Sequence, residues 1–179
     1  MERLVVEIRP VAQDELGFLE RKIGFDWAAL GKHRERFARQ QEGKVVYLVA
    51  WLGNLPVGHV LVKREGTTDD PTLSQLGDCP NLEDLFVAPA HRSRGVGSQL
   101  LDASEALAKR QGFSRIGLGV AVDNPRARML YELRGYEDAG FGEYTTGGHY
   151  VDRDGQEKTW EEVCRYLIKQ LETTEGQGR

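Results

Sequence analysis

The sequence predicts one mixed α/β domain in which helices flank a central, mostly antiparallel sheet. With 179 residues, 40% hydrophobic and 29% charged, the chain is long enough for a single soluble domain with a core. Several strand-like segments come before the first strongly amphipathic helix, which excludes a simple doubly wound parallel sheet. We expect the domain to span residues 1–172 and the polar segment 173–179 to form a disordered tail.

Alternating or densely β-branched segments predict the strands. The expected strands are 4–9, 45–52, 56–63, 82–87, 114–120, 136–144 and 163–171. A turn at Gly53-Asn54 joins the second and third of them into a hairpin. A further small hairpin is expected within 147–159, around the Asp154-Gly155 turn, and 66–80 is expected to be a loop.

Helical periodicity and end signals predict the helices. They are expected from Asp14 onward, at 26–42, at 97–111 and from Asn124 to about Arg134. Asn124 is a natural N-cap, and Pro125 occupies the favoured first helical position. The strand-helix-strand unit over 82–120 should supply one parallel strand pair through a right-handed crossover.

Composition excludes several classes of protein. The net charge of −4 gives no general attraction to nucleic acid or to an anionic membrane, and no apolar run approaches the roughly 20 residues that span a bilayer. Two cysteines and no recognisable secretion signal favour the cytoplasm. Four scattered histidines and no CxxC pair predict no metal site.

The segment from His91 to Ser98 has the features of a phosphate-binding turn. It lies between a predicted strand and a long helix, and its glycines allow backbone N–H groups to converge at the positive helix end. Arg92 and Arg94 add positive charge. A solvated tight turn fits the same residues about as well, because Gly-x-Gly alone is weak evidence.

A dinucleotide fold is a rival explanation of this turn. Its fingerprint needs a third glycine where Leu100 stands, although Asp123 would serve as the acidic residue after the next strand. The dinucleotide motif normally opens its domain, whereas several strands come before this turn. The context therefore disfavours a dinucleotide-binding protein.

Two motifs resemble those of the GNAT acetyltransferase superfamily. The family's coenzyme A pattern, Arg/Gln-x-x-Gly-x-Gly/Ala, falls on Arg92, Gly95 and Gly97 without a gap. The second motif, Asn-x-x-Ala-x-x-x-Tyr-x-x-x-Gly-Phe, is similar to 124–136, with Tyr136 replacing the usual Phe. The resemblance implies a GNAT-like acyl-CoA N-acyltransferase fold and an enzyme that uses acetyl-CoA. A catalytically silent acyl-CoA-binding module is the alternative.

The resemblance also implies where the coenzyme binds. The strand 82–87 should splay from its neighbour and receive the pantetheine arm, with the N–H of Leu85 or Phe86 contacting the thioester carbonyl. The expected coenzyme contacts are Leu85, Phe86, Val87, Arg92, Ser93, Arg94, Gly95, Val96, Gly97, Ser98, Asn124, Arg126 and Tyr131.

Amine acetylation needs a base for the amine and an acid for the departing thiolate. Glu83 and Asp84 begin the strand before the turn, and neighbours on a strand point to opposite faces, so one of them should face the amine. Leu-Glu-Asp resembles the matching strand of diamine acetyltransferases, which favours Glu83 as base with Asp84 in reserve. Either carboxylate is otherwise an ordinary solvated strand end.

Tyr131 is the candidate acid, because a phenol keeps its proton until about pH 10. Helical position alone favours a core aromatic, and the family motif reverses that preference. We expect acetyl-CoA and an amine acceptor as partners: a polyamine-like or aminoglycoside-like amine, an amino acid or a peptide N-terminus. The sequence leaves a homodimer open.

Other features have simpler explanations. The basic run Lys32 to Arg39 is expected to be a solvated helix face. Phe25 and Trp27 are expected either at the acceptor pocket or in the core. His149 and Tyr150 are expected to be loop residues without a role. Cys164 is expected to be a small core residue rather than a nucleophile.

Overall fold

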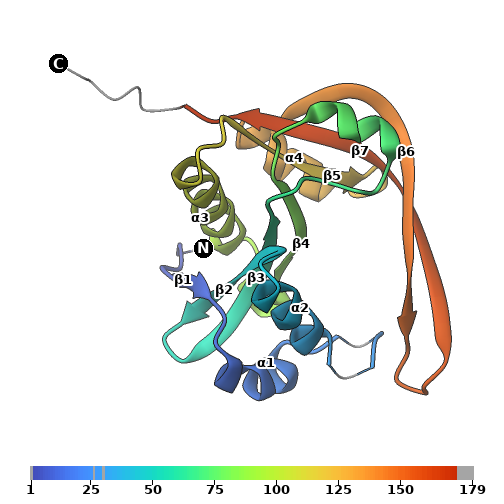
Figure 1. Ribbon diagram of the computed structural model, residues 1–179. Coiled ribbons are helices and arrows are strands. Elements are labelled where there is room, and N and C mark those ends of the chain that lie inside the picture. The colour runs from blue at the N-terminus through green and yellow to red at the C-terminus, as the bar shows by residue number, and fades with distance from the viewer. Residues whose placement is uncertain (1, 26, 30, 173–179) are drawn as a thin grey trace.

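The fold is described from a computed structural model, which places residues 2–25, 27–29 and 31–172. Seven strands in the described residues form one sheet in the order β1-β2-β3-β4-β5-β7-β6, and helices lie on both faces (Figure 1). All neighbouring strands pair antiparallel except β4 and β5, which are parallel. The predicted fold class is confirmed, and so is the parallel strand pair of the crossover unit.

The first half of the chain builds one end of the sheet. Its strands are β1 (Glu7–Pro10), β2 (Val45–Leu52) and β3 (Leu55–Lys63). Its helices are α1 (Leu16–Lys22), which follows a 3-10 turn at Gln13–Glu15, and α2 (Lys32–Gln41). The hairpin of β2 and β3 is as predicted.

The second half carries the crossover. β4 (Asn81–Val87) leads through a short 3-10 turn, η3 (Pro89–His91), into α3 (Val96–Arg110), and β5 (Arg115–Ala121) follows. α4 (Pro125–Leu133) comes next, and the Asn124 side chain accepts a hydrogen bond from the Ala127 N–H at 3.1 Å, as an N-cap does. β6 (Glu137–Val151) and β7 (Glu157–Gln170) complete the sheet.

The predicted elements need four corrections. Residues 4–6 lie outside β1 because their backbone bonds to the start of the crossover instead. The Gln99 side chain of α3 accepts from the Val6 N–H and donates to the Leu4 carbonyl, and the Leu4 N–H donates to the Arg94 carbonyl. The helix expected at 26–42 begins only at Lys32, after Gly31 in the left-handed conformation; Asp26 lies outside the described residues. The loop at 66–80 contains a 3-10 helix, η2 (Pro71–Leu76).

The last correction concerns the C-terminal strands. One long two-stranded ribbon, β6 and β7, replaces three predicted elements and turns near Gly155. These elements are the strand expected at 136–144, the small hairpin at 147–159 and the strand expected at 163–171. β5 pairs with β7 only over 115–121, so the far half of the ribbon extends beyond the sheet (Figure 1). The tail 173–179 lies outside the described residues, so its predicted disorder and the domain boundary stay predictions.

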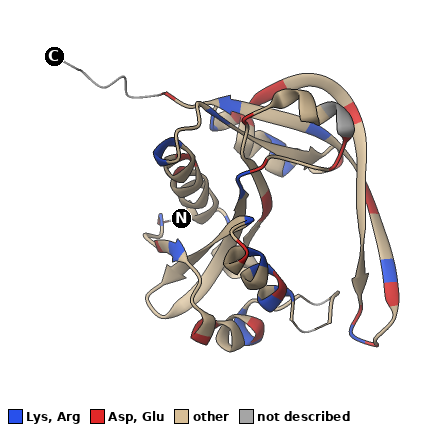
Figure 2. Ribbon diagram, in the orientation of Figure 1, with Lys and Arg blue, Asp and Glu red and all other residues tan. Residues whose placement is uncertain are grey.

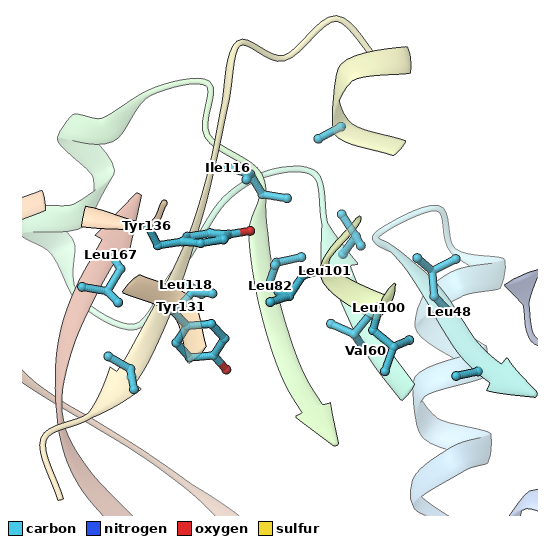
Figure 3. Close-up of a cluster of buried hydrophobic side chains, with 14 of the residues drawn as sticks. Leu48, Val60, Leu82, Leu100, Leu101, Ile116, Leu118, Tyr131, Tyr136 and Leu167 are labelled. Carbon is cyan, nitrogen blue, oxygen red and sulfur yellow. The ribbon is translucent and has the colours of Figure 1, made fainter. Parts of the chain in front are cut away.

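Two side-chain clusters mark the two faces of the sheet near the site. Under α3 and α4, Leu82 of β4 and Leu118 of β5 pack with Leu100, Leu101 and Tyr131 (Figure 3). On the opposite face, Tyr144 and Tyr166 pack with Leu73 and Leu76 of η2. Side chains at successive strand positions therefore point to different clusters, and this alternation decides which residues face the candidate site.

Candidate active site

A pocket of about 550 Å³ opens where β4 ends, between the start of α3 and α4. All the predicted coenzyme contacts line it except Arg94, whose carbonyl accepts the Leu4 N–H at 3.0 Å. The pocket also has lining residues that the sequence interpretation missed: His91, Ala127, Met129, Leu130 and Leu133. The sequence signal that could have found them is the apolar pair Met129 and Leu133, one helical turn apart on α4. In the structure both side chains are exposed.

The turn before α3 is built by unusual backbone angles. Ser93 has φ 59° and Gly95 has φ 80°, so the chain reverses sharply and α3 begins at Val96. The first turn of a helix leaves N–H groups unpaired and carries partial positive charge, which suits a phosphate. The guanidinium of Arg92 donates to the Val87 carbonyl at 2.8 Å, and Arg126 donates to the Ser93 hydroxyl at 2.7 Å. These bonds tie the turn to β4 and to α4.

The parallel pair β4 and β5 separates almost as soon as it forms. Only Asn81 with Gly117 and Leu82 with Leu118 are paired, so the rest of β4, from Glu83 to Val87, has no partner on that side. The pocket lies beside this unpaired edge, which includes Leu85, Phe86 and Val87. Unpaired strand N–H and C=O groups at an edge are available to an extended ligand.

A β-bulge changes where the two candidate carboxylates point. Opposite β4, the pairing shifts between His59 and Leu61, and Asp84 has φ 52°, in the left-handed region. Glu83 and Asp84 consequently both reach helix α2: Arg39 donates to Glu83 at 3.0 Å and Arg36 donates to Asp84 at 2.8 Å. The expectation that the two residues face opposite sides of the strand was wrong, because the bulge breaks the alternation.

The environments of the two carboxylates differ. Glu83 is half-buried; besides Arg39, the Asn81 amide donates to it at 3.4 Å and the Lys63 ammonium lies 3.9 Å away. The Asp84 carboxylate is about half exposed and has the Arg36 guanidinium as its ion-pair partner. Figure 2 shows the basic positions of α2 beside the acidic start of β4.

The basic run on α2 is therefore only partly solvated, contrary to expectation. Arg36 is buried, with its guanidinium 4.5 Å from the centre of the Phe25 ring, and His33 is fully buried. The His33 ring shares a 2.6 Å hydrogen bond with the Tyr47 hydroxyl. Burial, opposed by the Ile23 carbonyl, lowers the pKa of His33.

Tyr131 reaches the pocket from α4. Its ring packs 6.0 Å from that of Tyr136 in the core, and burial raises the pKa of its hydroxyl to about 12 (Figure 3). Within the described residues the hydroxyl has no hydrogen-bond partner, and Tyr131 lines the same pocket as the Arg92 to Gly97 turn. A protonated phenol thus lies in the same pocket as the phosphate-binding turn.

The tip of the β6 and β7 ribbon closes over the segment between α1 and α2. The Ala29 N–H donates to the Val151 carbonyl at 2.7 Å, and the Trp27 and Tyr150 rings meet edge to face at 5.0 Å. Phe25 links this contact to the pocket, because its ring lies 6.5 Å from that of Phe86. His149 and Tyr150 are therefore strand residues of β6 rather than loop residues as expected, and Tyr150 contacts Trp27. Cys164 is buried, as expected.

Comparison with known proteins identifies the family. Residues 8–136 match the model of the acetyltransferase (GNAT) family, which covers more than half of the chain, and the protein belongs to that family. This membership excludes the dinucleotide-binding interpretation. Within the described residues no helix is long and apolar enough to cross a membrane, and no group of three or more His, Cys, Asp or Glu side chains is arranged to hold a metal ion.

Sequence relatives match over short segments. The chain is 44% identical over 64 residues to the uncharacterized N-acetyltransferase YhfO of Bacillus subtilis, covering 35% of this chain and 43% of that protein. It is 37% identical over 57 residues to thialysine N-epsilon-acetyltransferase of Bos taurus, covering 32% of this chain and 34% of that protein. The chain thus matches less than half the length of these relatives.

Solved structures match over nearly the whole fold. An N-acetyltransferase from Staphylococcus aureus superposes with a TM-score of 0.67 at 15% identity, covering 94% of this chain and 99% of that one. A putative acetyltransferase from Salmonella typhimurium, solved with acetyl-CoA, has a TM-score of 0.62 at 15% identity, covering 97% of this chain and 98% of that one. At such identities the match establishes the fold alone.

Proposed function

We propose that this protein is an acetyl-CoA-dependent N-acetyltransferase that transfers the acetyl group directly to a primary amine in a ternary complex. One observation supports this above all: a single pocket joins the Arg92 to Gly97 turn to Tyr131 beside the unpaired edge of β4. The turn suits a diphosphate, the edge suits an extended pantetheine arm, and Tyr131 lines the same pocket. A silent binding module has no need of a protonated phenol there.

The reaction distributes its proton transfers between two residues. Glu83 accepts a proton from the ammonium group, directly or through water, because an alkylammonium with a pKa near about 10 is mostly protonated at neutral pH. The neutral amine forms the new N–C bond at the thioester carbonyl, whose oxygen the N–H of Leu85 or Phe86 polarises. The C–S bond then breaks, and Tyr131 donates its proton to the departing thiolate. The proton that the attacking nitrogen loses on becoming an amide returns to the Tyr131 oxygen, directly or through water, which restores the phenol. Asp84 is the reserve base.

The coenzyme contacts follow from the same pocket. Arg92 and Arg126 provide positive charge, while the backbone at Ser93, Gly95, Val96, Gly97 and Ser98 faces the diphosphate. Leu85, Phe86, Val87 and Asn124 contact the pantetheine arm. We keep Arg94 as a peripheral charge, because it does not line the pocket.

The acceptor is a small molecule or a peptide N-terminus. Polyamine-like and aminoglycoside-like amines and amino acids remain the candidate small molecules, and one relative is named for thialysine. The ion pairs of Glu83 and Asp84 count against a polyamine, since an arginine already balances each carboxylate. We further propose a cytoplasmic protein that needs no metal.

Calorimetry with the purified chain tests the coenzyme half of this proposal. We expect coenzyme A to bind and NAD to give no heat; the reverse result would refute the proposal. Release of free thiol from acetyl-CoA is then followed with spermidine, kanamycin, L-lysine and a tripeptide with a free N-terminus. Coenzyme binding without thiol release from any amine would favour the silent acyl-CoA-binding module.

A further inference from the structure

Helix α4 carries more apolar side chains than its contact with the core uses. Ala127, Leu130 and Tyr131 pack into the cluster under α3 and α4. Met129 and Leu133 are instead 58% and 79% exposed, and both line the candidate pocket. Large apolar side chains that are open to water and line a concave pocket are typical of a ligand contact. We therefore asked which part of a ligand these two residues fit.

The helical repeat places this apolar pair on the side of α4 that starts at the phosphate-binding turn. Successive residues of an α-helix are rotated by about 100°, so Met129 and Leu133 lie within about 60° of Arg126 around the helix axis. Arg126 donates to the Ser93 hydroxyl of the turn at 2.7 Å. Because all four residues line one pocket, that pocket continues from the turn along this side of α4.

Tyr131 lies on the other side of the same helix. It is rotated by about 160° from both Met129 and Leu133 around the helix axis. Only 8% of Tyr131 is exposed, and its ring packs into the core. Tyr131 marks the reacting end of the coenzyme in the proposed mechanism, so the apolar pair lies away from the thioester and from the acceptor amine.

The chemistry of coenzyme A leaves one part of the molecule for this surface. The charged diphosphate belongs at the turn and the pantetheine arm at the edge of β4, which leaves the adenosine end, joined to the other side of the diphosphate. Adenine has a flat aromatic face that packs on apolar side chains, and a methionine sulfur makes favourable contacts with aromatic rings. Leu133 lies about 10 Å beyond Arg126 along the helix axis, a distance that a ribose and its base can span.

We propose that Met129 and Leu133 bind the adenine ring of acetyl-CoA, which lies along the outward side of α4. This inference rests on the proposed acetyltransferase function and assigns the part of the pocket that takes the adenosine end of the coenzyme. Neither side chain offers a strong hydrogen-bond donor or acceptor, so burial of apolar surface and van der Waals contact hold the base. The contact therefore contributes to coenzyme affinity and takes no part in the chemical step.

Serine substitutions test the contact. Both side chains are exposed, so Met129→Ser and Leu133→Ser should fold, and melting curves check this. Each should weaken coenzyme A binding about fivefold or more in calorimetric titrations. Leu55→Ser is the matched control, because Leu55 is an exposed leucine of β3 outside the described lining of the pocket, and it should bind coenzyme A as the wild-type chain does. Dissociation constants of both pocket variants within about twofold of the wild-type value would overturn the inference.

A fluorescent coenzyme shows whether the base itself is held. In etheno-coenzyme A the adenine is the fluorescent group, so its anisotropy reports how freely the base moves in the complex. We expect high anisotropy when the analogue is saturated with the wild-type chain. Anisotropy should fall in the saturated complex of a Met129→Ser, Leu133→Ser double variant, because the base then swings free while the diphosphate stays bound. A freely moving base in the wild-type complex would overturn the inference.

Failure of this inference differs from failure of the proposed function. A wild-type chain that binds neither coenzyme A nor etheno-coenzyme A would refute the proposed function. A wild-type chain that binds both, but is a dimer that Leu133→Ser separates without loss of coenzyme affinity, would assign the apolar pair to an interface with a second copy. That result would overturn the adenine contact and leave the proposed function standing.

Discussion

The Arg39 guanidinium donates to the Glu83 carboxylate at 3.0 Å, so a cation of α2 holds the proposed base of β4. Arg36, one turn earlier on the same helix, holds Asp84 in the same way. Helix α2 therefore balances the charge of both carboxylates. A base held in this way must accept its proton while it remains beside an arginine.

We expect Glu83→Gln to slow turnover by about 10²- to 10⁴-fold at neutral pH, the usual range for one positioned acid or base. The loss should shrink as pH rises, because more of the amine is then neutral before it binds. Rates of thiol release measured from pH 6 to about pH 10 check this. Asp84→Asn is the matched control, and full activity of Glu83→Gln at neutral pH would assign the base role to Asp84 or to a water chain.

Gly97→Val should weaken acetyl-CoA binding by about tenfold or more while the fold survives. A Cβ at Gly97 would meet Leu130 and Val87 at 3.6 Å and 3.7 Å, which is ordinary contact, so Gly97→Ala should fold normally. The two further methyl groups of valine would fill the space next to the helix N–H groups. Calorimetric titration of the alanine and valine variants measures the difference, and unchanged affinity of Gly97→Val would mean that the diphosphate binds elsewhere.

Tyr131→Phe should lower kcat by about 10²- to 10⁴-fold with little change in coenzyme affinity, since only the hydroxyl is lost. Because burial raises the pKa of Tyr131 to about 12, its deprotonation should not reduce wild-type turnover below about pH 11. Single-turnover rates and acetyl-CoA titrations separate the two effects. A packing role alone would leave kcat near the wild-type value in this variant.

Acidification below about pH 6.5 should destabilise the fold through two buried histidines. Burial lowers the pKa of His33, and burial together with Arg36 lowers the pKa of His59 well below its usual value. The unfolded chain then binds more protons than the folded one below about pH 6.5, so stability falls as pH falls. Each histidine contributes at most about 1.4 kcal/mol per pH unit.

Melting curves between pH 7.5 and about pH 5 test this dependence. His59→Phe keeps an aromatic ring between Phe86 and Tyr47 and removes one titrating group. We expect this variant to lose less Tm on acidification than the wild-type chain does. Parallel losses of Tm in the two proteins would show that His59 is protonated in the folded state.

The sequence by itself determined the features that depend on neighbouring residues. The segment predicted as a strand at 45–52 is β2 with the same bounds, and Asn124 is the N-cap of α4, as predicted. Both predictions succeed because alternation and capping involve only a few consecutive positions. The spacing of Arg92, Gly95 and Gly97 indicated the family for the same reason. A strand, a tight turn and a helix start are encoded in one short segment.

Only the tertiary structure decided where the segments meet. The pairing of β4 with β5 stops after two residues, and the bulge at Asp84 depends on the register with β3, which no local pattern encodes. The contact of Tyr144 with Gly119 joins positions 25 residues apart across an intervening strand. Strand register is set by packing on both faces of the whole sheet, so the neighbours of Glu83 follow from the complete fold rather than from its sequence surroundings.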